Sequence, residues 1–255
     1  MPLETPRSRY RQLADLLRSA IERGEYPPGS VLPSEPELSQ RYEVSRPTIN
    51  RAVSILRTQG LVRVDRGRGT IVREIPVIRR AAVTRYESSQ RERAGARGAF
   101  DAEIRGLGMT SRSDVEVSQV TPPPEVARAL RLPEGRDNVI VRKRRMYAND
   151  VPVQLAPSYI PAQIATGTPL AEPDPGPGGI ISRFADLGYP QARITETVRV
   201  RTASDEERQF LRLDPDQAVI EIWHVGWTAD DLPVEVCIHS MPAYLWTLDY
   251  EWPTG

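Results

Sequence analysis

The 255-residue chain contains a single cysteine and two histidines, and none of its apolar runs approaches the roughly 18 residues that span a membrane. With Cys237 alone, an intramolecular disulfide is excluded, and the apolar residues Val234–Ile238 around it indicate a buried strand residue rather than a nucleophile. His224 and His239 lack metal-ligand spacing, and the sequence shows neither a nucleophile elbow nor a phosphate-binding loop. We therefore expect a protein that is not an enzyme and that has no metal site and no cofactor.

The start of the chain lacks the apolar run of about 7–15 residues that marks a secretory signal peptide. We therefore expect the protein in the cytoplasm, away from membranes. Hydrophobic residues make up 39% of the chain and charged residues 27%, a balance that excludes a disordered polyelectrolyte. Because a typical domain has roughly 100–200 residues, the length of this chain favours two domains.

Lysine is absent from residues 1–80, where arginine supplies all of the basic charge. This part holds 15 Arg against 9 Asp and Glu, a net charge of +6, and the rest of the chain carries −6. Such a division predicts that the first part binds a polyanion. Unpaired surface arginine is the alternative interpretation.

The first 45 residues predict two helices. Residues 6–24 repeat apolar side chains at helical intervals, at Tyr10, Leu13, Leu16, Leu17, Ala20 and Ile21. A second, short helix is predicted after Ser34, which can act as its N-cap with Glu37 as the capping-box partner, and it ends near Tyr42.

A third helix and a hairpin complete the first domain. The helix is predicted to begin after Ser45 and to end at Gly60, with helical spacing of Ile49, Ala52, Val53 and Leu56. Strand-like runs at Leu61–Val64 and Thr70–Arg73 are joined by a basic, glycine-rich segment, which predicts a β-hairpin. Three helices followed by such a hairpin predict a winged helix-turn-helix over residues 1–76.

A helix-turn-helix places its second helix in the major groove, where the N-terminal residues of that helix reach the base edges. This predicts contacts to DNA from Ser45, Arg46, Pro47, Thr48, Asn50 and Arg51. Arginine pairs with guanine and asparagine with adenine, whereas the hydroxyl groups suit phosphates. The hairpin tip adds guanidinium groups and small residues that approach the duplex, at Arg66, Gly67, Arg68 and Gly69. A small helical domain with a solvated basic face is the alternative.

Four motifs in this order resemble the N-terminal domain of GntR-type bacterial repressors: Leu32–Glu35, Val44–Ile49, Gln59–Val62 and Arg66–Thr70. The resemblance implies double-stranded DNA as partner and adds Ser34 and Glu35 to the predicted interface. Two residues depart from the pattern of the family. Pro36 and Asn50 stand where many relatives have arginine, which implies an unusual operator preference.

Residues 77–112 are rich in Arg, Ser and Gly, and they predict a linker and the lead-in to the second domain. From residue 113 to 255, strand-like runs alternate with short helices. Hairpins are predicted across Asn149-Asp150, between strands 138–147 and 151–160, and across Asp230-Asp231. The expected fold class is therefore α+β, with an antiparallel sheet in the second domain.

The second domain resembles the UTRA effector domain of the HutC branch, whose mixed α+β fold is that of chorismate lyase. The matching segments are Val141–Arg145, Val151–Val153, Ser158–Pro161 and Leu232–Glu235. The resemblance implies a small-molecule effector. Ala156 stands where many relatives have a glutamate that binds a sugar-type effector, which makes an amino-sugar phosphate a less expected ligand.

The period of two in a β-strand places Arg142 and Arg144 on the same face. Two half-buried guanidinium groups need an anion, which is either a phosphate or carboxylate of an effector or the side chains of Glu196 and Glu235. The resemblance implies that Arg142, Arg144 and Glu235 line the effector site. The full candidate set is Arg142, Arg144, Ser158, Tyr159, Glu196 and Glu235.

The sequence thus predicts a DNA-binding transcriptional regulator, expected to be a repressor that binds a pseudo-palindromic operator as a homodimer and responds to a small anionic effector. A chorismate-lyase-like enzyme fused to a DNA-binding module is the alternative, and it predicts turnover of a small aromatic acid. A protein-interaction module that uses the winged helix without DNA is a third possibility. Salt-sensitive duplex binding would exclude it.

Overall fold

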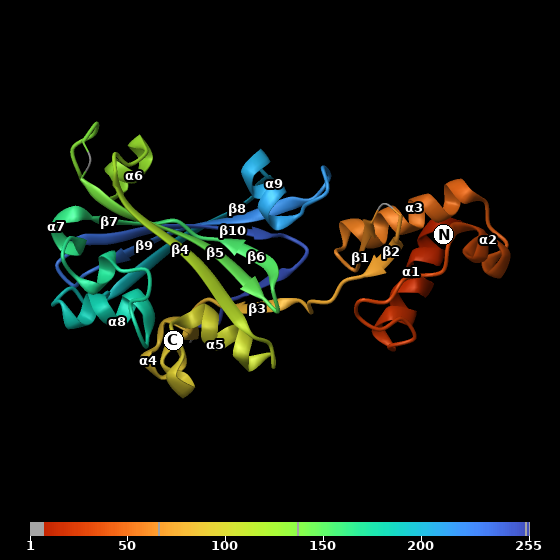
Figure 1. The fold of residues 1–255 in the computed structure, drawn as a ribbon, viewed down its shortest axis with the longest axis horizontal. Helices are drawn as coiled ribbons and strands as arrows, with labels where there is room; N and C mark the ends of the chain where they lie inside the picture. The colour runs from red at the N-terminus through yellow and green to blue at the C-terminus, as the bar shows by residue number, and fades with distance from the viewer. Residues whose placement is uncertain (1–7, 66, 137, 253, 255) are drawn as a thin grey trace. The chain divides into compact units, whose positions relative to one another are not determined.

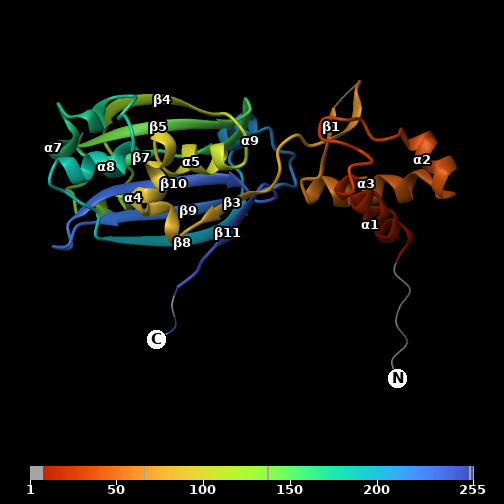
Figure 2. The same ribbon diagram turned by 90° about the horizontal axis from the view of Figure 1, so that it is seen from below.

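The computed structural model describes residues 8–65, 67–136, 138–252 and 254, and the chain divides into two compact units, Met1–Pro76 and Val77–Gly255 (Figures 1 and 2). In the described part of the chain, no helix has the length and apolar character needed to cross a membrane.

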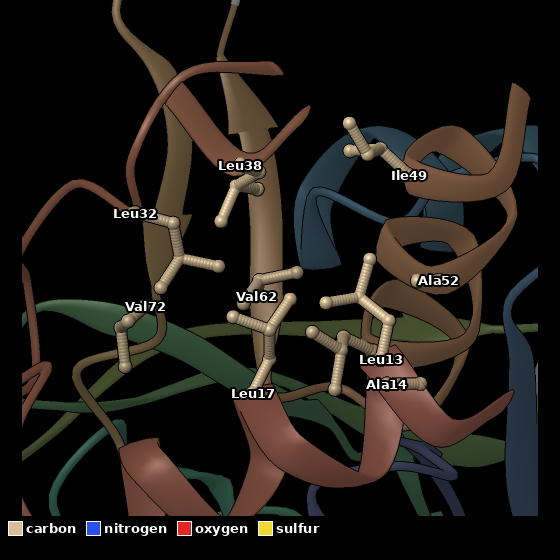
Figure 3. Packing of buried hydrophobic residues seen from close by; sticks show 10 residues of the cluster. Leu13, Ala14, Leu17, Leu32, Leu38, Ile49, Ala52, Val62 and Val72 are labelled. Atoms are coloured by element: carbon tan, nitrogen blue, oxygen red, sulfur yellow. The ribbon is translucent and has the colours of Figure 1, made fainter. Parts of the chain in front are cut away.

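The first unit consists of three helices and a two-stranded hairpin: α1 (Arg9–Glu22), α2 (Glu35–Tyr42), α3 (Arg46–Thr58), β1 (Val62–Asp65) and β2 (Gly69–Val72). Its core joins all of these elements (Figure 3), through Leu13, Ala14, Leu17, Leu32, Leu38, Ile49, Ala52, Leu56, Val62 and Val72. The periodicity of the sequence predicted most of this face. Leu16 is the exception, since its side chain is 54% exposed.

The ends of α2 explain the tight helix-turn-helix. At its start, the carboxylate of Glu37 accepts hydrogen bonds from the backbone N–H and the hydroxyl group of Ser34, both at 2.7 Å. These bonds lower the pKa of Glu37. At its end, Glu43 adopts a left-handed conformation with φ of 52° and reverses the chain toward α3. The predicted capping partners therefore meet, and only Glu43, Val44 and Ser45 separate the two helices.

The second unit is built on an antiparallel sheet of seven strands: β4 (Ser111–Val120), β5 (Val139–Ala148), β6 (Val151–Leu155), β7 (Ser158–Pro161), β8 (Arg193–Thr202), β9 (Ala218–Trp227) and β10 (Pro233–Pro242). The strand order is β4-β5-β6-β10-β9-β8, and β7 pairs with β5 and β10. At the turn between β5 and β6, Asn149 and Asp150 both have positive φ, as a two-residue hairpin turn requires.

One predicted strand is divided in two. Residues 151–160 were expected to be continuous, but β6 ends at Leu155 and β7 begins at Ser158. Pro157 lies in the gap and has no N–H to donate to a neighbouring strand. Its carbonyl group accepts a hydrogen bond from the N–H of Ile238 at 3.0 Å, so β10 still contacts the interruption.

Helices cover both faces of this sheet (Figures 1 and 2). On one face lie α4 (Ser88–Arg91), α5 (Ala99–Gly106) and α8 (Gly179–Asp186), and on the other lie α6 (Pro124–Ala129) and α9 (Asp205–Leu211). Short helices fill the connections: η1 (Thr84–Tyr86), η2 (Arg93–Gly95), α7 (Ala162–Ala165) and η3 (Pro169–Ala171). Phe184 of α8 packs in one core cluster with Ile140 and Ile160 of the sheet.

The segment predicted as a linker and lead-in, residues 77–112, is regular in the structure. Its strand β3 (Ile78–Ala81) pairs in parallel with β11 (Trp246–Asp249) near the end of the chain. Ile78 and Ile104 are fully buried. The sequence predicted a linker because arginine is normally found on the surface of a protein. In the structure, however, Arg80 and Arg85 of this segment are buried.

Candidate nucleic-acid interface and ligand cavity

The start of α3 is held by short polar residues. Ser45 is its N-cap in an extended conformation, Arg46 is the first helical residue, and Pro47 lies in the first turn. The hydroxyl oxygens of Ser45 and Thr48 are 3.0 Å apart. Proline is favoured at this position because the N–H that it lacks has no partner within the helix.

The outer face of α3 carries the predicted contact residues. Arg46, Pro47, Asn50 and Arg51 are exposed, whereas Ile49 on the inner face is buried. The guanidinium carbon of Arg51 lies 5.7 Å from the ring centre of Tyr10 in α1, within the range of a cation–π interaction. Arg46 and Asn50 therefore present exposed hydrogen-bonding groups within the first two turns of the helix.

A groove of about 590 Å³ runs between α2, α3 and the hairpin. Polar side chains line it, from Ser34, Glu35, Asn50, Ser54, Arg57 and Arg68. Arg57 was not among the predicted contact residues, and the sequence signal for it is its place on the same helix, seven positions after Asn50 and three after Ser54. Pro36, one of the departures from the family pattern, is exposed in the first turn of α2.

The hairpin tip is exposed at Gly67, Arg68 and Gly69. Gly67 and Gly69 have φ of 84° and 95°, a region that side-chain-bearing residues rarely adopt. Arg66, which was predicted to contact DNA, lies outside the described residues.

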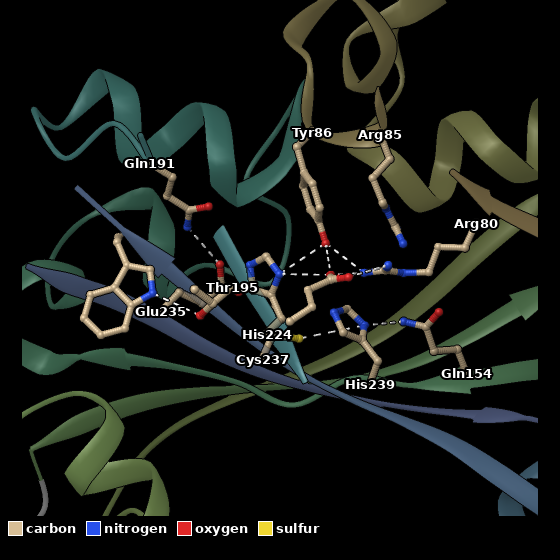
Figure 4. Close-up of polar contacts among 12 residues, drawn as sticks. Arg80, Arg85, Tyr86, Gln154, Gln191, Thr195, His224, Glu235, Cys237 and His239 are labelled. Atoms are coloured by element: carbon tan, nitrogen blue, oxygen red, sulfur yellow. Dashed lines mark hydrogen bonds and ion pairs between the residues drawn. The ribbon is translucent and has the colours of Figure 1, made fainter. Parts of the chain in front are cut away.

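The second unit contains a cavity of about 440 Å³ between the sheet and its α5 and α8 cover. Three of the predicted effector residues line this cavity together, namely Arg142, Arg144 and Glu235. Ser158, Tyr159 and Glu196 are not among its lining residues. The cover contributes η1, the start of α5 and the start of α8, and Figure 4 shows side chains of η1 above those of the sheet.

Arg142 is 1% exposed and is bound by neutral acceptors. Its guanidinium group donates to the carbonyl groups of Leu170, at 2.9 Å, of Pro173, at 3.1 Å, and of Glu172. Burial, together with the positive charge of Arg144, lowers the pKa of Arg142 to about 10. Arg142 therefore anchors the loop before α8, and the possible internal ion pair to Glu196 or Glu235 is not formed.

Arg144 is also held by neutral groups. Its Nε donates to the carbonyl oxygen of Ala156 at 3.0 Å, and its Nη2 to Ser158 Oγ at 2.8 Å and Cys237 Sγ at 3.1 Å. Ser158 is fully buried and orients Arg144 instead of lining the cavity. Cys237 is buried as predicted, and burial raises the pKa of its thiol. The described carboxylates form no ion pair with either Arg142 or Arg144.

The prediction for Tyr159 is not supported by its position. In β7, Ser158 pairs with Arg142 and Tyr159 pairs with Val141, so the two β7 residues point to opposite faces of the sheet. Tyr159 packs against the buried cluster of Val126 and Val139 under α6. An aromatic residue in the core therefore explains this side chain.

Glu196 is the partner of Arg80, and not of Arg142 or Arg144 as the sequence had allowed. Its carboxylate accepts hydrogen bonds from Arg80 Nη1 at 2.9 Å and from the hydroxyl group of Tyr86 at 2.6 Å, and it lies 3.4 Å from His224 Nδ1. Burial opposes its ionisation, but the bonds to His224 and Arg80 outweigh this and hold the pKa of Glu196 well below its usual value. Arg80 is fully buried.

Several cavity residues were missed by the sequence analysis, including Arg85, Tyr86, Gln154, His224 and His239. The sequence analysis did not predict that His224 and His239 meet, but their ring centres are 6.1 Å apart. Gln154 Nε2 lies 2.8 Å from Nδ1 of His239, and burial keeps the pKa of His239 well below its ordinary value. The alternation of Glu235, Cys237 and His239 along β10 was the available signal. The described residues include no cluster of His, Cys, Asp and Glu suited to a metal ion.

Both parts of the chain match known sequence families. Residues 9–72 match the profile of bacterial regulatory proteins of the gntR family, and residues 106–244 match the UTRA domain. An uncharacterized HTH-type transcriptional regulator of Streptomyces coelicolor is 35% identical over 253 residues, which cover 96% of this chain and 93% of that protein.

Two further similarities agree with these matches. The HTH-type transcriptional regulator GgaR of Escherichia coli K12 is 28% identical over 230 residues, which cover 90% of this chain and 85% of GgaR. The crystal structure of PhnF from Mycobacterium smegmatis aligns with a TM-score of 0.60 over 97% of this chain and 100% of PhnF. At 20% identity, this last similarity shows a common fold.

Proposed function

The chain belongs to the GntR family of bacterial transcriptional regulators, as a DNA-binding protein with a C-terminal UTRA effector domain, and we propose that it is a homodimeric repressor controlled by a small anionic effector. The effector occupies the cavity of the second unit. The observation that carries the anionic class is the pair Arg142 and Arg144, which line the same cavity and pair with no carboxylate in the described part of the chain. Because its target is chromosomal DNA, its place of action is the cytoplasm.

In this proposal, α3 reads the operator. Arg46 is exposed in the first turn and suits a bidentate contact to guanine, and Asn50 one turn later suits adenine. Each such pair contributes about 1–3 kcal/mol of base discrimination. Glu35, exposed at the start of α2, can accept from the amino group of a cytosine. Asn50 in place of arginine then favours adenine at that base pair.

Phosphate contacts come from the start of α3 and from residues that line the groove. Ser45 and Thr48 offer hydroxyl groups at the start of α3, Ser34 does so at the start of α2, and Arg57 and Arg68 bring positive charge from two sides. Such contacts fix the register of the protein on the duplex without selecting a base sequence.

A homodimer and a repressive output follow from the way these regulators occupy DNA. Helix-turn-helix dimers place two recognition helices on half-sites about one helical turn apart, or multiples of it. The edge strand β8 offers a surface for the pairing of two copies, since its Val198 and Val200 side chains are 40% and 68% exposed. A dimer that covers both half-sites blocks a promoter.

The charge balance of the cavity supports an anionic ligand. Six arginines line it, Arg85, Arg97, Arg105, Arg112, Arg142 and Arg144, against the carboxylates of Asp101, Asp174 and Glu235, and Glu235 accepts a hydrogen bond from Gln191 Nε2 at 3.1 Å. An oxyanion beside Arg142 and Arg144 would complete their hydrogen bonding.

The chain is proposed to bind this ligand without converting it. The thiol of Cys237 lies 4.0 Å from His239 Nδ1, but burial raises the pKa of the thiol and lowers that of the imidazole. Both groups are therefore neutral at pH 7, which does not suit a thiolate–imidazolium pair. Incubation with small aromatic acids would expose a lyase-like activity by formation of product.

Selection of bound duplexes from a random-sequence pool at about 150 mM salt tests the DNA-binding part, because phosphate-only binding is suppressed there. The proposal expects a two-fold symmetric site that the Arg46→Ala variant fails to select. Recovery of a single asymmetric half-site would contradict the homodimer.

Thermal unfolding of the full chain with inorganic phosphate, succinate and a neutral polyol tests the effector class. The oxyanions are expected to raise the unfolding temperature of wild type, and Arg144→Ala is expected to abolish the shift. Arg145→Ala is the matched control, because Arg145 neighbours Arg144 in β5 but is exposed and pairs with Glu116 at 3.2 Å. A shift given only by the polyol would overturn the anionic class.

A further inference from the structure

Residues 77–86 connect the boundary of the first unit directly to the cavity of the second. The segment begins with β3, which carries Arg80, and ends with η1, which carries Arg85 and Tyr86. Arg85 and Tyr86 both line the cavity. A segment that leaves the DNA-binding unit therefore supplies two consecutive residues to the wall of the ligand site within ten residues of the boundary.

Arg85 has hydrogen-bonding groups that no described residue satisfies. Its side chain is 6% exposed, and its Nη2 lies 3.3 Å from Glu103 Oε2. Among the described residues, none accepts a hydrogen bond from its Nε or Nη1. Burial raises the pKa of Glu103, which weakens this carboxyl group as a counter-ion. Figure 4 shows Arg85 reaching from the cover toward the sheet, and in this view its end lies above the guanidinium group of Arg80.

Tyr86 joins the cavity wall to the strand that leads from the first unit. Its hydroxyl group donates to Glu196 at 2.6 Å, accepts from Arg80 Nη2 at 2.8 Å and lies 3.1 Å from Nδ1 of His224 (Figure 4). Arg80 is fully buried in β3, and Glu196 is its ionic partner. A displacement of Tyr86 therefore acts on a hydrogen bond that positions β3.

We propose that Arg85 binds the oxyanion group of the effector and that Tyr86, through Glu196 and Arg80, transmits occupancy of the cavity to β3. This inference rests on the proposed function of the cavity as the effector site. An oxyanion that is bound by the guanidinium group of Arg85 fixes η1, and Tyr86 is the next residue in the same short helix. The effector class is then an anion held from the sheet by Arg144 and from the cover by Arg85.

The binding step is tested by calorimetric titration of the full chain with inorganic phosphate and with succinate, which separates phosphate from carboxylate recognition. Arg85→Gln is expected to weaken binding by roughly tenfold or more, as the loss of hydrogen bonds to a charged group does. Arg85→Lys keeps the charge and is expected to restore part of the affinity. The control is Arg105→Gln, because Arg105 also lines the cavity but is half-exposed and paired with Asp101 at 2.8 Å.

The transmission step is tested by hydrogen exchange of the backbone amides of residues 78–82, which pair with β11. With the oxyanion that binds, the exchange rates of these amides are expected to change in wild type. In Tyr86→Phe, binding is expected to persist and the exchange response to disappear. The phenylalanine ring keeps the packing of Tyr86 and removes only its hydroxyl group.

Three results would overturn the inference. Unchanged affinity in Arg85→Gln, with loss in Arg144→Ala, would remove Arg85 from the site and leave the proposed effector cavity intact. A retained exchange response in Tyr86→Phe would refute the route through Glu196. Absence of binding of both phosphate and succinate to wild type would contradict the anionic effector and this inference together.

Discussion

Arg80 and Glu196 are 116 positions apart in the sequence and form an ion pair beneath the wall of the cavity, with side chains 0% and 9% exposed. Arg79, the preceding residue of β3, forms a second ion pair, to Asp249, but its side chain is 73% exposed. Two adjacent arginines of one strand thus form a buried and a surface ion pair. Removing each pair in turn therefore measures how much a buried ion pair and an exposed ion pair contribute to the stability of the second unit.

Glu196→Gln is expected to destabilise the second unit by about 3–5 kcal/mol, because it leaves the buried guanidinium group of Arg80 without its counter-charge. Asp249→Asn, which removes the exposed pair, is expected to cost less than about 1 kcal/mol. Urea unfolding followed by tryptophan fluorescence measures both, since all four tryptophans lie after residue 77 and report on the second unit alone. Equal losses in the two variants would refute the assignment.

The buried imidazole of His239 is expected to make the second unit sensitive to mild acid. Burial and the nearby charge of Arg80 keep its pKa well below the ordinary value, so the folded protein holds it neutral. The unfolded chain takes up a proton below about pH 6.5, and the free energy of unfolding therefore falls as the pH is lowered, by at most about 1.4 kcal/mol per pH unit.

His239→Gln replaces the imidazole with a group that does not titrate and can still hydrogen-bond to Gln154. Its unfolding free energy between pH 7 and pH 5 is expected to depend less on pH than that of wild type. Parallel curves for the two proteins would show that His239 does not contribute to this dependence.

Gly178→Ala is expected to destabilise the cover of the cavity more than Gly188→Ala does. Both glycines have positive φ, 76° and 83°, so both substitutions add backbone strain of about 1 kcal/mol or more. A Cβ on Gly178 would also overlap Ser182 Oγ and lie 2.8 Å from Ser182 Cβ, whereas one on Gly188 meets no atom within 4 Å. Thermal unfolding of the two variants gives the comparison, and equal losses would contradict the steric argument.

Arg46→Ala and Arg68→Ala are expected to affect DNA binding differently. Loss of Arg46 should cost about 1–3 kcal/mol on the selected operator and relax the preference at one base pair. Loss of Arg68 from the wing should weaken binding to all duplexes and reduce the slope of log affinity against log salt by about one. Fluorescence anisotropy over a salt series distinguishes the two, and a base-specific effect of Arg68→Ala would contradict its assignment to phosphate.

The first unit could be predicted closely because local rules govern it. The cap at Ser34, the helical spacing of Ile49, Ala52 and Leu56, and the glycines of the wing each determine conformation over a few residues. These rules also placed the start of α3 at the surface.

The cavity could be predicted only in part. The period of two correctly placed Arg142 and Arg144 on one face of β5. No local rule shows which residues of β7 face the cavity side of the sheet, and Ser158 and Tyr159 point to opposite faces. The pairing of β3 with β11 depends on residues more than 160 positions apart, for example Ile78 and Trp246. The residues that this pairing brings to the wall, among them Tyr86, therefore carried no signal in the sequence.

The most direct test of a regulator controlled through this cavity is an anisotropy titration of the selected operator with the full chain, with and without the oxyanion that most raises its unfolding temperature. The oxyanion is expected to change operator affinity by about 5–150-fold, the range of allosteric coupling, in wild type and in Arg145→Ala but not in Arg144→Ala. An operator affinity that is identical with and without the bound oxyanion in wild type would contradict control through this cavity.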